Sequence, residues 1–205
     1  MNQPQISKPS RRLSGARRRS WLVGMATLLV AGAAWAGSYA HSATHVTKKS
    51  SEHVLSVLTA YGNYCNEGCK YYGPDVKEFV QVPYKKTATA WYTWTYVSTT
   101  MKDVKYFNRV TLTKKDDGSF VLVTRQLDAK DEAVVKGLVE KTGKEHSPAF
   151  DTGKTVFTVG PVEDGKTKVV QSMSMTASGM LDMFGGKIKD GMKAGAEATF
   201  KNIEK

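Results

Sequence analysis

The most regular pattern in the chain lies near its end, between Met180 and Lys205. There, apolar residues recur every three or four positions, which is the spacing of one face of an α-helix. This pattern predicts a long amphipathic helix that packs one stripe of side chains against the rest of the domain. The stripe consists of Leu181, Phe184, Ile188, Met192, Ala196, Phe200 and Ile203.

The same segment contains four glycines. Glycine in a helix interior costs about 1 kcal/mol relative to alanine, so their presence needs a reason. They indicate a close approach to a sheet or ligand, or space left for a guest molecule; fraying at the first two is the alternative. The glycines are Gly185, Gly186, Gly191 and Gly195.

The middle of the chain is rich in β-branched and aromatic residues, arranged in short runs between turn signals. Asp-Gly pairs at residues 117–118 and 164–165 are typical of hairpin turns. Consecutive hairpins imply an antiparallel sheet, which must bury one face against another element. The predicted strands are residues 76–83, 88–99, 106–114, 119–127, 153–159 and 166–176.

Two shorter helices complete the predicted order. One begins near Ser50, which can cap the first turn, and Gly62 is a natural stop. The other covers residues 131–141, with its acidic residues first and its apolar residues on one face. The resulting fold class is α+β, with the long C-terminal helix lying across an antiparallel sheet.

The first 36 residues have the parts of an export signal. Five arginines between Arg11 and Arg19 precede an uncharged apolar run, residues 21–36, which ends in a small-x-small pattern. This is the organisation of a secretory signal peptide, and the run is shorter than the roughly 20 residues that span a bilayer. An uncleaved signal anchor is the alternative, and Arg18-Arg19 also suits a twin-arginine signal. The sequence therefore predicts a bacterial protein exported to the periplasm or secreted.

Removal of this segment changes the charge of the protein. The whole chain carries a net charge of +11, but after residue 36 there remain 24 basic and 19 acidic residues, a net charge of +5. The lysines are scattered among acids without interleaved aromatics, which excludes a nucleic-acid module. Such a surface could favour anionic lipid headgroups, so the membrane surface is a candidate partner. We expect a tether over residues 37–49 and one domain over residues 50–205.

Cys65 and Cys69 lie close together in the chain. In an exported protein such a pair favours a disulfide that closes a short loop, and Gly68 supplies flexibility. A redox site usually has two intervening residues, and a zinc site would need two more ligands, for which the four histidines have no matching spacing. We expect a structural disulfide, with a metal or redox site and free thiols as alternatives.

Three stretches of the chain resemble the START-like, or SRPBCC, helix-grip superfamily. Residues 91–97 and 101–109 resemble the two strands that START domains join around an Arg-Asp turn, with Lys102-Asp103 in place of that pair. Residues 165–171 resemble the last strand, and residues 178–200 resemble the gripping helix. The resemblance covers roughly residues 70–205 and implies a curved antiparallel sheet with a cavity under the C-terminal helix.

The resemblance implies a hydrophobic ligand, such as a lipid or sterol, in that cavity. Strand alternation places Val169, Gln171, Met173 and Met175 on one face, and their apolar character favours the inward one. Gln171, Tyr96 and Arg109 are candidates for selectivity, and residues 91–96 and 180–188 for the opening. The candidate ligand-binding residues are Trp91, Trp94, Tyr96, Tyr106, Arg109, Phe157, Gln171, Met173, Met175, Met180, Phe184 and Ile188.

Signals of catalysis are few. No nucleophile-elbow, P-loop, dinucleotide or metalloprotease spacing is present. Glu145-His146 is more typical of an exposed loop than of an acid–base pair. Arg109 and Arg125 have two candidate roles: binding an anionic headgroup if they face inward, or pairing with acids such as Asp103 or Asp128, which is the favoured role. We therefore expect a binding protein with no catalytic residues, metal or cofactor, and the pattern predicts no particular oligomeric state. A cyclase or hydrolase in the same cavity, and a solid, ligand-free envelope interaction domain, are the alternatives.

Overall fold

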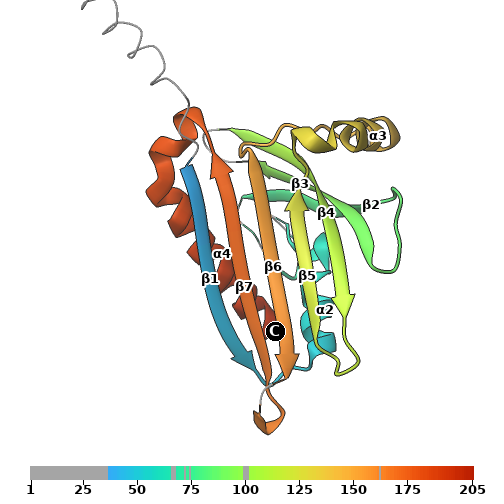
Figure 1. Ribbon diagram of the computed structural model, residues 1–205, viewed down its shortest axis with the longest axis vertical. Helices are drawn as coiled ribbons and strands as arrows, with labels where there is room; N and C mark the ends of the chain where they lie inside the picture. The colour runs from blue at the N-terminus through green and yellow to red at the C-terminus, as the bar shows by residue number, and fades with distance from the viewer. Residues whose placement is uncertain (1–36, 66–67, 72, 74, 99–101, 162) are drawn as a thin grey trace, which may run out of the picture. The chain divides into compact units, whose positions relative to one another are not determined.

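One antiparallel sheet dominates the part of the chain that the computed structural model describes, which is residues 37–65, 68–71, 73, 75–98, 102–161 and 163–205. Its seven strands are β1 (Gly37–Thr47), β2 (Val76–Val82), β3 (Ala90–Ser98), β4 (Asp103–Lys114), β5 (Phe120–Gln126), β6 (Thr152–Pro161) and β7 (Thr167–Ala177). They lie in the order β1-β7-β6-β5-β4-β3-β2 (Figure 1). The six predicted strands and their antiparallel pairing are confirmed. The predicted signal segment, residues 1–36, lies outside the described residues.

β1 corrects the expectation of a tether over residues 37–49. It pairs with β7 along its whole length, from Gly37 opposite Ala177 to Thr47 opposite Thr167. The side chains of β1 are mostly small or polar, and only Tyr39 and Thr47 are buried among them. Backbone hydrogen bonds to β7 hold this edge strand in place. The pattern of its side chains therefore did not predict a strand.

Three α-helices are present in the described residues: α2 (Ser51–Leu58), α3 (Glu132–Thr142) and α4 (Gly185–Ile203). The hydroxyl of Ser50 accepts a hydrogen bond from the backbone N–H of His53, which confirms the predicted cap of α2. α4 begins later than predicted, because Gly179–Phe184 form a 3₁₀ helix. No helix in this part of the chain is long and apolar enough to cross a membrane.

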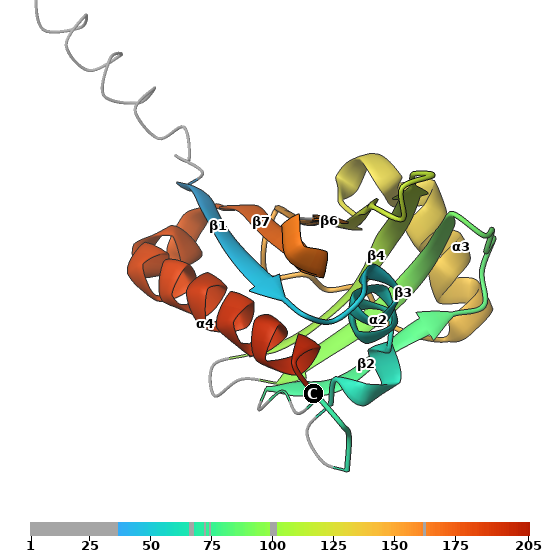
Figure 2. The same cartoon turned by 90° about the horizontal axis from the view of Figure 1, so that it is seen from below.

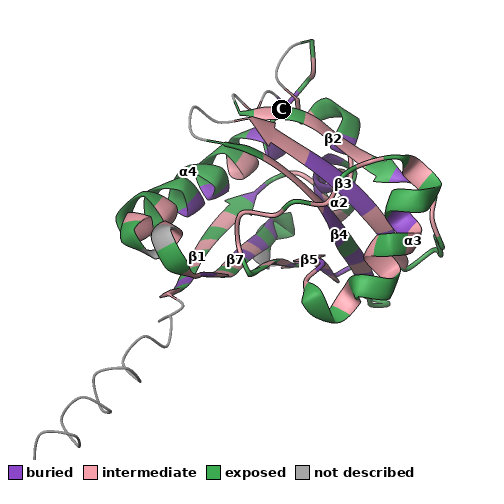
Figure 3. Ribbon diagram, turned by 90° about the horizontal axis from the view of Figure 1, so that it is seen from above, coloured by how far each residue is buried: buried purple, intermediate pink, exposed green. Residues whose placement is uncertain are grey.

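The helices cover opposite faces of the curved sheet. α2 and α4 lie within the curve, on the face that we call the inner face, and α3 lies against the outer face (Figure 2). On the inner side, α2 packs with residues of β3 to β7 in one core cluster, which Ile203 of α4 also joins. On the outer side, Leu138 of α3 packs with Trp94 and Phe107 in a separate cluster. Both faces of β3 and β4 therefore carry buried positions (Figure 3).

α4 follows β1 along the edge of the sheet, as the packing of the two elements shows. A Cβ atom at Gly185 would lie 2.7 Å from Cε1 of Tyr39, so this glycine permits the close approach of α4 to β1. Gly186, Gly191 and Gly195 have no such neighbour within 4 Å. The prediction of a close approach therefore holds for one of the four glycines.

The C-terminal end of α4 is held by several contacts. Ile203 is fully buried, and its carbonyl oxygen lies 2.9 Å from Nε2 of His53 in α2. The ring of His45 in β1 stacks on Phe200 with 5.1 Å between centroids, and its Nε2 lies 2.6 Å from Oε1 of Glu204. These contacts join α4 to both β1 and α2.

We predict that Ile203→Ala lowers the free energy of unfolding by about 2–5 kcal/mol, because it removes a fully buried side chain and leaves a cavity. Urea unfolding followed by circular dichroism measures this change. Lys201→Ala, at an exposed position of the same helix, is the control and should change stability by less than about 0.5 kcal/mol. Equal effects of the two substitutions would contradict the anchoring role of Ile203.

An ion pair joins β5 to the segment that leads into α3. Nη1 and Nη2 of Arg125 donate to Oδ2 and Oδ1 of Asp131 at 2.7 and 2.8 Å. Oδ2 of Asp131 also accepts from the backbone N–H of Asp128 at 3.0 Å. The hydrogen bonds from Arg125 are the main cause of a pKa of Asp131 below its ordinary value of 3.8. Of the two roles considered for Arg125, pairing with acids is thus the one observed.

We predict that this pair makes stability depend on acid pH. Because the folded state lowers the pKa of Asp131, its contribution is present above the unfolded pKa of about 3.9 and is lost as pH falls through the folded value. Asp131→Asn should therefore lower the urea midpoint at pH 7 and reduce its fall between pH 5 and pH 3. A pH profile of the variant parallel to that of the wild type would contradict this.

Candidate ligand-binding cavity

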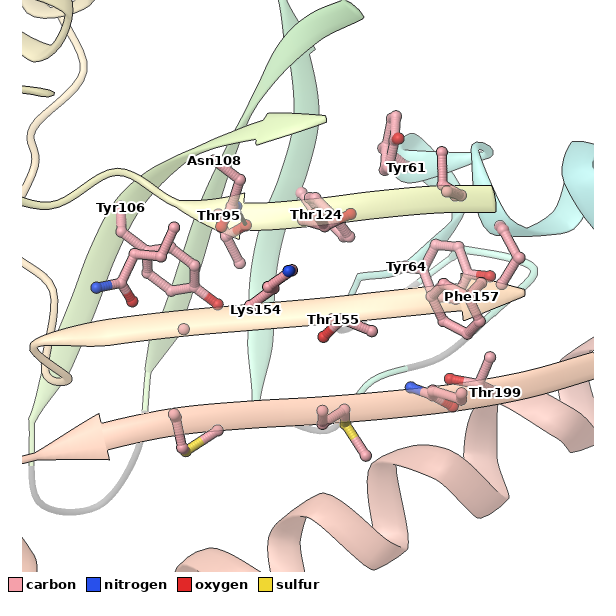
Figure 4. Close-up of a pocket in the computed structure, with 18 of the residues that line it drawn as sticks. Tyr61, Tyr64, Thr95, Tyr106, Asn108, Thr124, Lys154, Thr155, Phe157 and Thr199 are labelled. Atoms are coloured by element: carbon pink, nitrogen blue, oxygen red, sulfur yellow. Dashed lines mark hydrogen bonds between the residues drawn. The ribbon is translucent and has the colours of Figure 1, made fainter. Parts of the chain in front are cut away.

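A cavity of about 380 Å³ lies over the inner face of the sheet. Six strands, β2 to β7, contribute to its wall, and α2 contributes Leu58. α4 contributes Thr199 (Figure 4). Tyr61 and Tyr64, which follow α2, extend the wall on the same side. The volume lies within the range of about 300–1,000 Å³ that small-molecule sites occupy.

Five of the candidate residues line this cavity: Tyr106 of β4, Phe157 of β6, and Gln171, Met173 and Met175 of β7. They meet because cross-strand partners share a face: Phe157 lies opposite Gln171, and Thr155 opposite Met173. Their contact with a ligand stays a prediction. Trp91 is buried beside the cavity instead, where its Nε1 donates to the hydroxyl of Tyr61 at 3.1 Å.

The placement of Trp94, Tyr96 and Arg109 in the cavity is wrong. Trp94 lies on the outer face, where its Nε1 donates to the carbonyl oxygen of Glu145 at 2.8 Å. The hydroxyl of Tyr96 donates to Asp103 at 2.9 Å on the same side. Arg109 is exposed and lies opposite Tyr92 of β3. The inner face of β3 is formed by the alternate residues, among them Thr95 and Val97.

The start of the C-terminal helix also differs from the expectation. Phe184 precedes the first turn of α4 and is not among the described residues that line the cavity. Ile188 packs beside a cluster of Tyr39, Ala177 and Met192 at the edge of the sheet. The side chain of Met180 lies outside the described part of the structure.

The cavity wall includes polar side chains that the candidate set lacked. Asn108 of β4 donates from Nδ2 to the hydroxyls of Thr95 and Thr93, at 3.2 and 3.4 Å. Nε2 of Gln126 donates to the carbonyl oxygen of Phe150 at 2.7 Å. Residues two apart on a strand share a face, so the alternation that places Tyr106 inward also places Asn108 inward. Asn108 could therefore have been predicted as a lining residue from the sequence. The polar lining residues of the strands include Thr95, Asn108, Thr124, Gln126, Thr155 and Gln171.

Burial raises the pKa of three tyrosines of the cavity. Loss of solvation raises the pKa of Tyr61 and of Tyr64 well above the ordinary value of 10.0, and the hydrogen bond from Trp91 only partly opposes this at Tyr61. Burial also raises the pKa of Tyr106, with a hydrogen bond to Thr95 as the opposing effect. At neutral pH these three hydroxyls therefore act as uncharged hydrogen-bonding groups.

The described residues that line the cavity include no histidine, aspartate or glutamate. Lys154 contributes to the wall, but it alternates with Gly153 and Thr155 along β6 and is exposed. His146, from the Glu145-His146 pair, lies on the outer side, where its Nδ1 accepts from the backbone N–H of Phe107. Within the described residues, no cluster of three metal-binding side chains is present. Cys65 and Cys69 form the expected disulfide.

The likeness of the chain to known proteins lies in its three-dimensional structure. No protein-family model and no curated protein sequence matches it. The STAR-related lipid transfer protein of Xanthomonas axonopodis superposes with a TM-score of 0.59 at 16% identity, over 81% of this chain and 86% of that one. Human STARD10 gives 0.56 at 10% identity, over 80% and 62%. The Zhui aromatase/cyclase from Streptomyces sp. R1128 gives 0.54 at 12% identity, over 82% and 92%.

These superpositions, with the antiparallel sheet and the long α4, identify the START-like, or SRPBCC, helix-grip fold. The expected fold is thus confirmed. At 10–16% identity the likeness is one of fold, and the similar structures include a lipid transfer protein and an aromatase/cyclase.

Proposed function

We propose that this is an exported protein that binds a hydrophobic ligand, such as a lipid, in the cavity over the inner face. The observation that carries the proposal is the cavity itself, bounded by Phe157, Met173 and Met175 in place of a solid core. The STAR-related lipid transfer protein among the structural neighbours supports the same class of ligand. Burial of apolar ligand surface would supply the affinity, at about 25 cal/mol per Å².

Export is supported by two features of different kinds. The N-terminal sequence has the order of charged, apolar and small residues of a signal peptide. The Cys65–Cys69 disulfide is of a type that persists in oxidising compartments such as the periplasm. The membrane surface, as a second partner, stays a prediction that rests on the charge of the mature chain.

The cyclase or hydrolase alternative would need a group that transfers a proton to the ligand. The described lining residues offer neutral tyrosines, hydroxyls and amides for that task, with pKa values of the tyrosines raised away from neutrality. A general acid or base works best with a pKa near the operating pH. This electrostatic setting favours binding over acid–base chemistry.

We predict that Thr155→Trp abolishes ligand binding. Thr155 lies on the inner face of β6 and points into the cavity (Figure 4), so an indole there would occupy the space of a guest. Thr158→Trp is the matched control, because this threonine lies on the same strand but is exposed. Native mass spectrometry of protein purified from a bacterial envelope, with extraction and identification of bound lipid, measures occupancy.

Wild type and Thr158→Trp should carry the same co-purified apolar compound, and Thr155→Trp should carry none while remaining folded. Equal occupancy in all three proteins would place the ligand elsewhere. Absence of any ligand from the wild type would favour the ligand-free interaction domain. An extracted compound that the wild type alters chemically and Thr155→Trp leaves unchanged would favour the enzyme.

A further inference from the structure

Gln171 presents an unpaired acceptor to the cavity. It lies in the middle of β7 on the inner face, and only 4% of the residue is exposed. Its Oε1 atom is buried and has no hydrogen-bond donor among the described residues. A buried polar atom without a partner costs free energy, so its position against open space needs an explanation.

Several other polar groups of the wall are paired within the protein. Nδ2 of Asn108 donates to two threonine hydroxyls, and Nε2 of Gln126 donates to the carbonyl oxygen of Phe150. The hydroxyl of Tyr64 donates to the carbonyl oxygen of Val57 at 2.8 Å. Against this background, Oε1 of Gln171 is the group that a donor on a guest molecule would satisfy.

The charge of the wall restricts the guest further. Among the described lining residues, Lys154 carries the one formal charge, and its side chain is exposed on the outer face. A carboxylate or ammonium group in the cavity would therefore lose its hydration without gaining a counter-ion, which is costly. An uncharged donor has no such cost.

We infer that the ligand is an uncharged amphiphile with a hydroxyl group that donates a hydrogen bond to Oε1 of Gln171. This inference rests on the proposed function, since it names the chemical class of the guest. Phe157, opposite Gln171 on β6, and Met173, two residues along β7, surround the amide with apolar surface. The hydroxyl end of the ligand therefore lies inside the cavity and its apolar body fills the remaining space.

The size of the cavity selects suitable probes. At roughly 30 Å³ for each water-sized group, 380 Å³ holds about a dozen non-hydrogen atoms. 1-Dodecanol has this size, is uncharged and carries a hydroxyl donor. Dodecanoate has the same chain with a charged end, and dodecyl methyl ether has an oxygen that accepts but cannot donate.

Binding of these three compounds to the full chain, freed of bound lipid on a hydrophobic resin, is measured by displacement of the neutral fluorophore N-phenyl-1-naphthylamine. Wild type should bind 1-dodecanol roughly tenfold more tightly than the ether or dodecanoate, which is the order of one buried hydrogen bond. Gln171→Leu should lower the affinity for 1-dodecanol by a similar factor and remove its advantage over the ether. Gln81→Leu, at an exposed glutamine of β2, should leave all three affinities unchanged.

The outcomes separate this inference from the proposed function. If no compound displaces the fluorophore from wild type, or the fluorophore itself does not bind, both fail. If the ether or dodecanoate binds wild type as tightly as 1-dodecanol does, the cavity binds apolar compounds but the assigned donor is wrong. This comparison needs no variant, so it decides the question even if Gln171→Leu does not fold. A preference for 1-dodecanol that persists in folded Gln171→Leu also overturns the role of Gln171.

Discussion

The packing of α4 on the edge strand β1 is the interaction on which the cavity depends. Tyr39 of β1 and Met192 of α4 belong to one buried cluster, and Gly185 allows the helix to approach that tyrosine. Because β1 stands at the margin of the sheet beyond β7, a helix docked there leaves part of the inner face of β4 to β6 uncovered. At its other end the helix places Ile203 in the core cluster with α2, so both ends are held. A helix centred over the sheet would instead close a solid core.

The element that positions α4 is also the one that the sequence did not predict. Residues 37–47 contain two large apolar side chains, Tyr39 and Val46, and Val46 is 48% exposed. Strand prediction depends on the burial of alternate side chains, whereas β1 is stabilised mainly by its backbone pairing with β7. In contrast, β7 could be predicted because its inward Gln171, Met173 and Met175 alternate with the polar Ser172 and Ser174. This alternation predicted both the existence of β7 and which of its faces is the inner one.

The same reasoning explains why the candidate residues on β3 were wrong. β3 is covered on both sides, by α3 outside and by the cavity and α2 inside, so aromatic residues occur on both faces. Alternation shows that Trp94 and Tyr96 share a face, but it does not show which face is inner. A large aromatic side chain was the weaker indicator: the inner positions of β3 beside the cavity are Thr95 and Val97. The packing of α3 determines which face of β3 is the outer one, and such tertiary contacts cannot be read from strand alternation.

The polar wall bears on whether the space under α4 is an accident of packing. Thr95, Asn108 and Gln126 lie side by side on β3, β4 and β5, at positions where a solid core would gain stability from valine or leucine. The hydrogen bond from Asn108 to Thr95 and the one from Gln126 to the carbonyl oxygen of Phe150 remove part of the cost of burial. Oε1 of Gln171, in contrast, has no partner among the described residues. Apart from the exposed Lys154, the described residues of the wall carry no charge, several of its polar groups are paired, and Oε1 of Gln171 is an unsatisfied acceptor. Such a wall is poorly suited to a proton-transfer site and well suited to orienting one neutral polar group. The fold thus provides an apolar cavity, and the amide of Gln171 provides a polar group that orients a ligand within it.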